Sequence, residues 1–393
     1  MTTMSDLPRD LVVRILSRVP LTCMRRVRFT CKKWNSISKD PRFVKMHIDN
    51  AARQLIIMMS EHRLWLMSVN LHGYEDEDQL EGIGKLTSLT NNNNSDDQVE
   101  ISKVFHSNGL LLVLPTDKTR LVVWNPYLGH TRWIEPRRAF HMYDIYALGH
   151  DQNFENQKVL RVLDGITPDD WEVNPYKRGV SVSLKGDTYF FAKEKLVEDA
   201  QGYVNLGDVQ DFLICFDFTS ERFGPRLPLP FHSYPDDTVT LSSVREEQLA
   251  VYYLRDTWTM EIWVTDKIEP NVVSWNKKVF LAVDLEPLVG PIHQFAYQGG
   301  LFFIDEEKKI AVVFDKDQYL INDRAYLIGG NGGYYKEVDL GYLNGHNGIQ
   351  QVEDVMPPDD DDDVIAPLGC SYSPSSVKIQ HGIGARGKRK ERD

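Results

Sequence analysis

Long hydrophobic runs are absent from the 393-residue sequence, and uninterrupted apolar stretches such as residues 55–59 and 110–114 are only five residues long. A membrane-spanning helix needs about 20 apolar residues in succession, so we expect the protein to have no membrane partner. The first ten residues contain two acids and no apolar segment of the kind found in secretory signals. We therefore expect the protein in the nucleus, the cytoplasm or both.

Cysteine is scarce, and the four cysteines are never spaced as C-x-x-C. This argues against a structural zinc site and is typical of a reducing compartment. The eleven histidines are scattered singly, and the sequence has no Walker A phosphate loop, no G-x-S-x-G and no H-E-x-x-H. Residues 382–387 match G-x-G-x-x-G, but the six residues that follow are too few for a helix to receive a phosphate. We expect a non-catalytic protein with no metal and no cofactor.

Positive charge is concentrated at one end of the chain. The formal net charge of −12 argues against a general nucleic-acid binder. Residues 1–50, however, carry eleven Lys or Arg against four Asp or Glu, a net charge of +7, whereas residues 51–393 carry a net charge of −19. Opposite charges in two parts of the chain indicate two parts with different roles.

Residues 1–50 have the spacing of three short helices. Apolar residues recur at steps of three and four after Pro8, and Pro20 ends the first helix. A second helix is expected up to Trp34, and residues 40–41 begin a third. A bundle this small encloses a marginal core, because too little of its surface is removed from water. Its remaining apolar side chains must be covered either by a second polypeptide or by the rest of this chain.

The same residues carry a family resemblance. Residues 7–11 (LPRDL), 15–20 (ILSRVP), 27–34 (VRFTCKKW) and 40–43 (DPRF) resemble, in order, the whole of an F-box motif. The resemblance implies a helical module that binds the acidic Skp-type adaptor of an SCF (Skp–cullin–F-box) ubiquitin ligase, with Trp34 in the core of the module. The positive charge agrees with an acidic partner, since opposite potentials accelerate encounter. The family's adaptor contacts correspond to Leu7, Pro8, Leu11, Ile15, Leu16, Pro20, Leu21 and Met24.

From residue 51 onward the pattern is that of strands. Pairs of short apolar runs separated by polar turns recur seven times, which predicts seven antiparallel hairpins. Repeated hairpins with no helix between them favour a β-propeller; a β-sandwich is the alternative, although a single sandwich rarely needs so long a chain. The predicted pairs are residues 55–59 with 64–69, 109–113 with 121–125, 146–148 with 159–163, 188–191 with 212–217, 249–253 with 260–265, 301–304 with 310–315, and 325–328 with 334–340.

This region also resembles a known family. Residues 121–129 (LVVWNPYLG), 216–225 (FDFTSERFGP) and 261–265 (EIWVT) resemble the plant F-box-associated interaction domain, type 1. The resemblance extends from about residue 100 to 345 and implies a kelch-related propeller. Between residues 159 and 171 the sequence lacks an extra strand pair that the family generally carries. We therefore expect an incomplete blade, which would leave an unpaired strand edge.

These patterns predict an α+β multidomain chain with three parts. Residues 1–50 form a helical F-box, residues 51–345 form a mainly antiparallel, propeller-like domain, and residues 346–393 form a tail that is first acidic and then basic. Five consecutive Asp at 359–363 and clustered Lys and Arg at 386–392 predict that the tail is disordered. The basic cluster is compatible with nuclear import and equally with a solvated charged end.

The sequence thus predicts a non-catalytic substrate-recognition subunit of an SCF-type ubiquitin ligase, linked through the adaptor to a cullin and recruiting an unknown protein target. One alternative is a propeller-type lectin or enzyme with a helical cap. Another is a decaying family copy that binds the adaptor but presents no target. Four tryptophans near predicted strand ends are candidates for target contact, with core packing as the alternative: Trp133, Trp171, Trp258 and Trp275.

Overall fold

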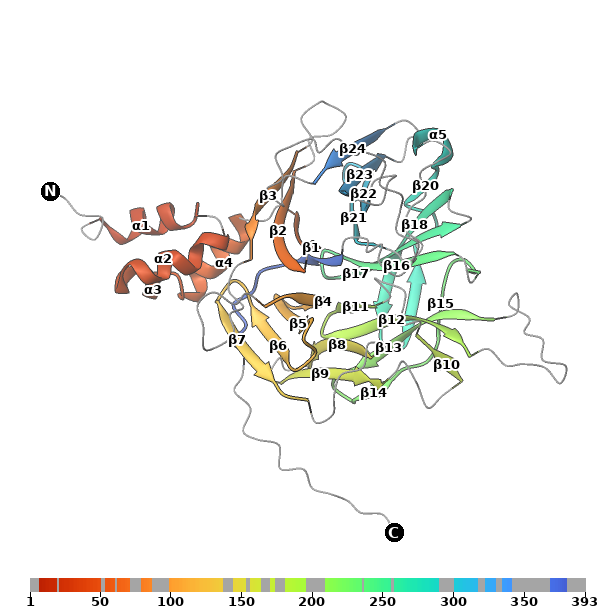
Figure 1. Cartoon of the computed structure of the whole chain (residues 1–393), viewed down its shortest axis with the longest axis horizontal. Coiled ribbons are helices and arrows are strands. Elements are labelled where there is room, and N and C mark those ends of the chain that lie inside the picture. The colour runs from red at the N-terminus through yellow and green to blue at the C-terminus, as the bar shows by residue number, and fades with distance from the viewer. Residues whose placement is uncertain are drawn as a thin grey trace, which may run out of the picture.

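The computed structural model shows a helical module beside a ring of antiparallel sheets (Figure 1), which confirms the predicted order of the two parts. The structure describes residues 7–19, 21–50, 54–60, 62–70, 79–86, 99–136, 144–152, 156–163, 170–173, 181–195, 209–234, 237–255, 258–289, 300–316, 322–329, 334–340 and 368–379. Within these ranges no helix is long and apolar enough to cross a membrane.

The helical module differs from the prediction in its second helix. Its elements are α1 (Arg9–Leu16), the 3-10 turn η2 (Leu21–Cys23), α2 (Met24–Thr30), α3 (Lys32–Ile37) and α4 (Pro41–Asn50). The expected single helix up to Trp34 is interrupted at Cys31, whose backbone is extended (φ −157°, ψ 157°). The Sγ of Cys31 accepts a hydrogen bond from the backbone N–H of Trp34 and so caps α3.

The module has a small core of its own. Five apolar side chains from α1 to α4 are buried together, and Trp34 packs against them as predicted. Each such side chain contributes about 1.5–3 kcal/mol when removed from water, so five give only a marginal core for the number of residues ordered. The buried side chains are Val12, Leu16, Met24, Ile37 and Phe43.

In the described residues after the helical module the strands form six antiparallel sheets, five of them with four or more strands. The first combines β1 (Gln54–Ser60), β2 (Arg63–Asn70) and β3 (Gln79–Lys85) with β25 (Leu368–Tyr372). The second contains β4 (Ile101–Ser107), β5 (Leu110–Pro115), β6 (Leu121–Asn125) and β7 (His130–Ile134). A two-stranded sheet pairs β8 (Ile145–His150) with β9 (Gln157–Val162).

The remaining three sheets have six, five and four strands. The fourth contains β10 (Trp171–Glu172), β11 (Ser181–Leu184), β12 (Asp187–Glu194), β13 (Asp211–Asp217), β14 (Arg222–Phe223) and β15 (Leu227–Pro228). The fifth contains β16 (Thr238–Val244), β17 (Gln248–Arg255), β18 (Thr259–Glu269), β19 (Val272–Trp275) and β20 (Leu281–Asp284), and the short helix α5 (Glu286–Val289) follows it. The sixth contains β21 (Phe302–Asp305), β22 (Ile310–Lys316), β23 (Asp323–Gly329) and β24 (Tyr335–Asp339).

The sheets follow chain order around a common centre (Figure 1), so the domain is a β-propeller of five full blades with one two-stranded sheet between the second and the third. Its innermost strands are β25, β4, β8, β11, β16 and β21. All seven predicted hairpins are confirmed, and two of them, 301–315 and 325–340, share the last blade. A sandwich has two facing sheets, and six sheets around one centre therefore exclude that alternative.

The ring is closed by a segment that the sequence analysis assigned to the tail. β25 pairs antiparallel with β1 from Leu55↔Tyr372 to Met59↔Leu368. The predicted domain boundary at 345 is therefore wrong, because residues 368–379 belong to the propeller. The rest of the predicted tail lies outside the described residues. After β25 the chain crosses the second blade, where the side-chain amide of Asn125 donates to the carbonyl oxygens of Ser375 and Val377 at 3.0 and 2.8 Å.

The two-stranded sheet lies where an incomplete blade was predicted. β8 and β9 are its only strands in the described part of the chain. β8 is buried along its whole length because its alternate side chains face different blades. Tyr146 and Leu148 pack against the second blade, while Ile145 and Ala147 pack against the fourth sheet. The short sheet therefore completes the ring even without further strands.

Candidate functional site

The helical module presents an apolar face to solvent. Leu11 and Ile15 lie one helical turn apart on α1 and are 46% and 40% exposed. Pro8, just before α1, is also exposed, and Phe29 on α2 is 80% exposed. Large exposed apolar side chains gathered on one element mark interaction surfaces. Pro8, Leu11 and Ile15, on or next to α1, are called the docking face below.

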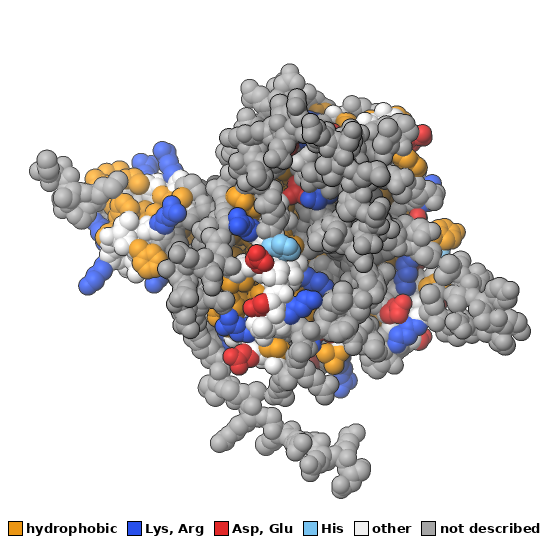
Figure 2. Space-filling model, in the orientation of Figure 1, with side chains coloured by type: hydrophobic (Ala, Val, Ile, Leu, Met, Phe, Trp, Pro, Cys, Tyr) orange, Lys and Arg blue, Asp and Glu red, His pale blue; other side chains and the backbone are white. Residues whose placement is uncertain are grey.

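Positive charge surrounds the docking face. Figure 2 shows Lys and Arg side chains together with apolar ones on the helical module. Asp10 and Asp40 are the only acidic side chains among residues 7–48, and Asp40 is already paired with Arg9 at 3.0 Å. An acidic partner would therefore meet a favourable potential. The exposed basic residues are Arg9, Arg14, Arg18, Arg26, Lys32, Lys33, Lys39, Arg42 and Lys45.

The structure divides the eight predicted adaptor contacts. Pro8, Leu11 and Ile15 are exposed, and Leu7 is partly exposed. Pro20 lies outside the described residues. The predictions for Leu16, Leu21 and Met24 are wrong, because these side chains are buried and offer a partner no exposed surface.

Leu16, Met24 and Leu21 are buried for two different reasons. Leu16 and Met24 are 0% exposed in the core of the helical module itself. Leu21 is buried with Val44 against the first and second blades of the propeller. Both faces of these short helices are apolar, so spacing alone could not separate the inner face from the outer one. Phe29 lies within the motif and is exposed, but it was not among the predicted contacts, because in the sequence only its position as an aromatic in a basic stretch marked it.

A buried arginine attaches the module to the propeller. The Nη1 of Arg28 donates to the carbonyl oxygen of Tyr127 at 2.5 Å, and its Nε donates to the Ser38 hydroxyl at 3.3 Å. The guanidinium lies 5.1 Å from the centre of the Tyr127 ring, within cation–π range. Tyr127 belongs to the turn between β6 and β7, so these contacts join α2 to the second blade. Burial lowers the pKa of Arg28 and raises that of Tyr127 to about 12.

A histidine makes a second bridge between the two parts. The Nε2 of His47, on α4, donates to the carbonyl oxygen of Val19 at 2.7 Å. A carbonyl can only accept, so Nε2 carries a proton, and in the neutral ring Nδ1 accepts from the Tyr127 hydroxyl at 3.1 Å. The lowered pKa of His47 favours this neutral form, in which both ring nitrogens have partners. Burial lowers the pKa of His47, the hydrogen bond to Val19 opposes this, and the nearby Arg28 lowers it further.

Replacing Arg28 by Leu is expected to weaken the attachment. The carbonyl oxygen of Tyr127 and the hydroxyl of Ser38 would lose their donor inside the interface. A buried polar group without a partner costs about 1–3 kcal/mol, so we expect a loss of about 2–4 kcal/mol. Urea unfolding of the full chain measures it. Arg26→Leu, an exposed position on the same helix, is the control, and equal stability of the two variants would contradict the role of Arg28.

His47 makes the attachment sensitive to acid. Its pKa in the folded protein lies below the ordinary value of 6.5, so its contribution is present above pH 6.5 and is lost as the pH falls towards the lower folded value. The melting temperature of the wild type should therefore exceed that of His47→Gln at neutral pH, and the difference should shrink on acidification. Thermal unfolding at a series of pH values tests this. A difference that stays constant with pH would show that His47 does not titrate as described.

Trp171 is not a target contact. Its side chain is only 3% exposed and lies in the core between neighbouring sheets. The ring meets Phe223 edge to face, with the ring centres 5.0 Å apart. The alternative interpretation, core packing, is the correct one for this residue.

The other three tryptophans are partly exposed but do not form one surface. Trp133 on β7 is covered by the guanidinium of Arg120, 4.3 Å from the ring centre. Trp275 on β19 donates its indole N–H to the carbonyl oxygen of Pro228 at 2.8 Å. Trp133 lies on the second blade, whereas Trp258 and Trp275 both lie in the fifth sheet, where Trp258 precedes the start of β18 and Trp275 pairs with Thr265 further along that strand. The structure therefore does not bring the three together as a binding site.

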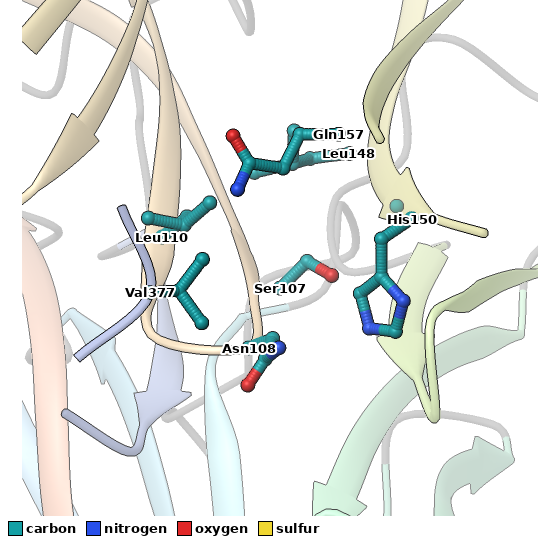
Figure 3. A pocket seen from close by; sticks show the side chains of 8 residues that line it. Ser107, Asn108, Leu110, Leu148, His150, Gln157 and Val377 are labelled. Atoms are coloured by element: carbon teal, nitrogen blue, oxygen red, sulfur yellow. The ribbon is translucent and has the colours of Figure 1, made fainter. Parts of the chain in front are cut away.

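A small pocket lies between the second blade and the two-stranded sheet. Figure 3 shows His150 and Gln157 on one side of it and Leu110, Asn108 and Val377 on the other. Its volume is about 10 Å³, which is room for about one water molecule. The pocket is therefore no substrate site. Within the described ranges, no three His, Cys, Asp or Glu side chains are grouped so that they could hold a metal ion.

The molecule thus combines a basic helical module, which has an exposed apolar face, with a closed propeller that holds the module by buried contacts. This is the organisation of a two-part binding protein. The F-box domain model matches residues 4–46, and the F-box associated beta propeller domain model matches residues 55–169 and 156–379. The chain belongs to the F-box proteins that carry this propeller, whose members are generally adaptor subunits.

Full-length relatives support this assignment. The chain is 51% identical to the Arabidopsis thaliana F-box protein At4g09790, with all of both chains covered. It is 45% identical to the F-box/kelch-repeat protein At3g16740 of the same plant, covering 96% of this chain and 100% of that one. Among solved structures, a protein of unknown function from Desulfotomaculum acetoxidans matches 73% of this chain and 98% of its own, with 10% identity and a TM-score of 0.34.

Proposed function

We propose that the protein is a substrate receptor of an SCF-type ubiquitin ligase. The helical module binds a Skp-type adaptor and through it a cullin, while the propeller holds a protein target. The observation that carries the proposal is the exposed docking face and the basic residues around it. This face stays exposed to solvent although other apolar residues of the module, such as Leu21 and Val44, are buried against the propeller. The receptor itself makes and breaks no bonds.

The contribution of such a receptor is proximity. A target held by the propeller stays near the ubiquitin-carrying enzyme, so a rare encounter is replaced by a high effective concentration. This requires that the two parts of the receptor keep a fixed relation. The buried contacts of Arg28 and His47 with Tyr127 support that requirement.

The connectivity favours one end of the propeller for the target. The helical module enters at the end where β1 begins and where β4 passes to β5 in a two-residue turn. The described strand ends that flank residues 87–98, 196–208 and 290–299 lie at the opposite end. Loops of variable length at one end of a rigid scaffold commonly carry binding residues. Adaptor and target would then occupy different ends of the molecule.

Reconstitution of the complex tests the proposal. The full chain is co-expressed with a Skp-type adaptor and a cullin, and the mixture is separated by size-exclusion chromatography. We expect the chain and the adaptor to elute together at equal stoichiometry and to bring the cullin with them. Separate elution of a folded chain and a folded adaptor would overturn the proposal.

The location of the proposed receptor follows from the same assignment. We propose that it acts in the nucleus, the cytoplasm or both. The basic cluster at 386–392, outside the described residues, supports entry into the nucleus.

A further inference from the structure

A short segment after β15 lies at the end of the propeller that is opposite the helical module. Residues 229–234 (LPFHSY) lead from β15 towards β16 and so from the fourth sheet to the fifth. The segment is hydrogen-bonded to Lys193 near the end of β12 and to Asp211 at the start of β13. These two strand ends flank residues 196–208, so the segment lies at the end that the connectivity favours for a target.

Side chains of the neighbouring strands hold the backbone of this segment in place. The Asp211 carboxylate accepts the backbone N–H of Ser233 at 2.8 Å. The Asp237 carboxylate accepts the backbone N–H of Tyr234, also at 2.8 Å. The Lys193 ammonium donates to the carbonyl oxygens of Ser233 and Tyr234 at 3.3 and 3.2 Å. A backbone fixed in this way has little conformational freedom left to lose when a partner binds.

An aromatic stack anchors the middle of the segment. Phe231 lies parallel to Tyr253 of β17, with the ring centres 4.2 Å apart and the ring planes 2° apart. Tyr253 is only 4% exposed, and its hydroxyl donates to the Asp237 carboxylate at 2.9 Å. The ring against which Phe231 packs is therefore itself fixed in the core.

Two aromatic side chains of the segment are nevertheless exposed. Tyr234 is 53% exposed and His232 is exposed as well, whereas Ser233 between them is buried. The His232 and Tyr234 rings meet edge to face, with their centres 5.3 Å apart. The Nδ1 of His232 donates to the Asp211 carboxylate at 2.9 Å, which fixes the orientation of the imidazole. Exposed aromatic side chains on a fixed backbone are typical of the residues that dominate binding interfaces.

The charge of the propeller favours a basic partner at this pair. Residues 51–345 carry 28 Lys or Arg against 44 Asp or Glu. Two carboxylates, Asp211 and Asp237, and one ammonium, Lys193, contact the segment itself. A negative surface accelerates the approach of a positive partner and disfavours a negative one. The face of an exposed tyrosine ring attracts a Lys or Arg side chain by the cation–π interaction.

We propose that the His232–Tyr234 pair binds a basic segment of the target protein, with a Lys or Arg side chain of the target over the Tyr234 ring. This rests on the proposed function, which supplies a protein target for the propeller. The partly exposed ring of Trp275 extends the contact surface, since its indole N–H is bonded to the carbonyl oxygen of Pro228 just before the segment. Apolar residues of the target segment pack there.

Selection of peptides on the purified full chain tests the contact. A phage-displayed library of random peptides is selected on the immobilised wild type, and the enriched peptides are synthesised and titrated by fluorescence anisotropy. We expect Arg and Lys to be enriched, and Tyr234→Ala to weaken binding by about tenfold or more. Tyr234→Phe keeps the ring and should bind like the wild type. Phe29→Ala, which removes an exposed aromatic side chain of the helical module, should also bind like the wild type.

Three results would overturn the proposal. They are enriched peptides without Lys or Arg, equal peptide binding by folded Tyr234→Ala and the wild type, and the absence of any peptide that binds saturably. Co-elution of the same chains with a Skp-type adaptor is measured in parallel. If the wild type and Tyr234→Ala both co-elute with the adaptor, a negative peptide result concerns the His232–Tyr234 pair alone. If neither co-elutes, it is the proposed function that fails.

Discussion

Deletion of residues 368–393 is expected to unfold the propeller. It removes β25, which pairs with β1 over five residue positions, and so exposes the edge of the first blade. It also removes Tyr372 from the apolar cluster shared by the first two blades, and Val377 and Ile379 from the cluster between the second blade and β8. Each large apolar side chain contributes about 1.5–3 kcal/mol, so the loss approaches the 5–15 kcal/mol that stabilises a typical domain.

A point substitution and a shorter deletion test whether the propeller unfolds because β25 no longer pairs with β1 or because the chain is shorter. A Cβ at Gly369 would lie 2.2 Å from the carbonyl oxygen of Ile57 and 2.7 Å from Cδ2 of Leu301, so Gly369→Val should prevent β25 from pairing. Deletion of 380–393 alone leaves every described contact of β25 in place and is the control. Circular dichroism melting and limited proteolysis report the result. A cooperative, protease-resistant propeller without residues 368–393 would contradict the role given to β25.

The double substitution Leu11→Asp, Ile15→Asp is expected to abolish adaptor binding, with a loss of affinity of at least 100-fold. Both side chains are exposed in the free protein, so the folded chain itself loses little. In a complex the two carboxylates would be buried in an apolar contact without partners, which costs several kcal/mol. Two added negative charges would also repel an acidic adaptor.

The control for this variant is Val272→Asp on β19. Val272 is 45% exposed, close to the 46% of Leu11, but it lies on the propeller. It should bind the adaptor as the wild type does. Isothermal titration of each purified chain with the adaptor gives the affinities, and thermal unfolding verifies that all variants are folded. If the folded double variant bound the adaptor with wild-type affinity, the adaptor would bind a surface other than the docking face.

Local sequence patterns predicted a strand well where a buried apolar run is bounded by polar turn residues. The run at 110–115 is apolar at nearly every position and is buried along its whole length in β5. Polar turns bound such runs, so the hairpins form from residues close in sequence and need no knowledge of the rest of the fold. The seven hairpins were therefore predictable from the sequence.

β25 could not be recognised in this way. Its residues, LGCSY, neither alternate clearly nor form an apolar run, and the strand lies 28 residues beyond the end of β24. Its place is determined by the unpaired edge of β1, more than 300 positions earlier in the chain. Pairing over that separation depends on the closed ring and leaves no local signal.

The amino-acid sequence by itself determined the two-part organisation, the hairpins and the apolar, basic character of the first 50 residues, because these depend on neighbouring residues. Only the tertiary structure decided which apolar residues stay exposed. Leu11 and Ile15 face solvent, whereas Leu21 is covered by the propeller and Trp171 lies in the core between neighbouring sheets. Exposure depends on which distant surface packs against each side chain, and that information is distributed over the whole fold.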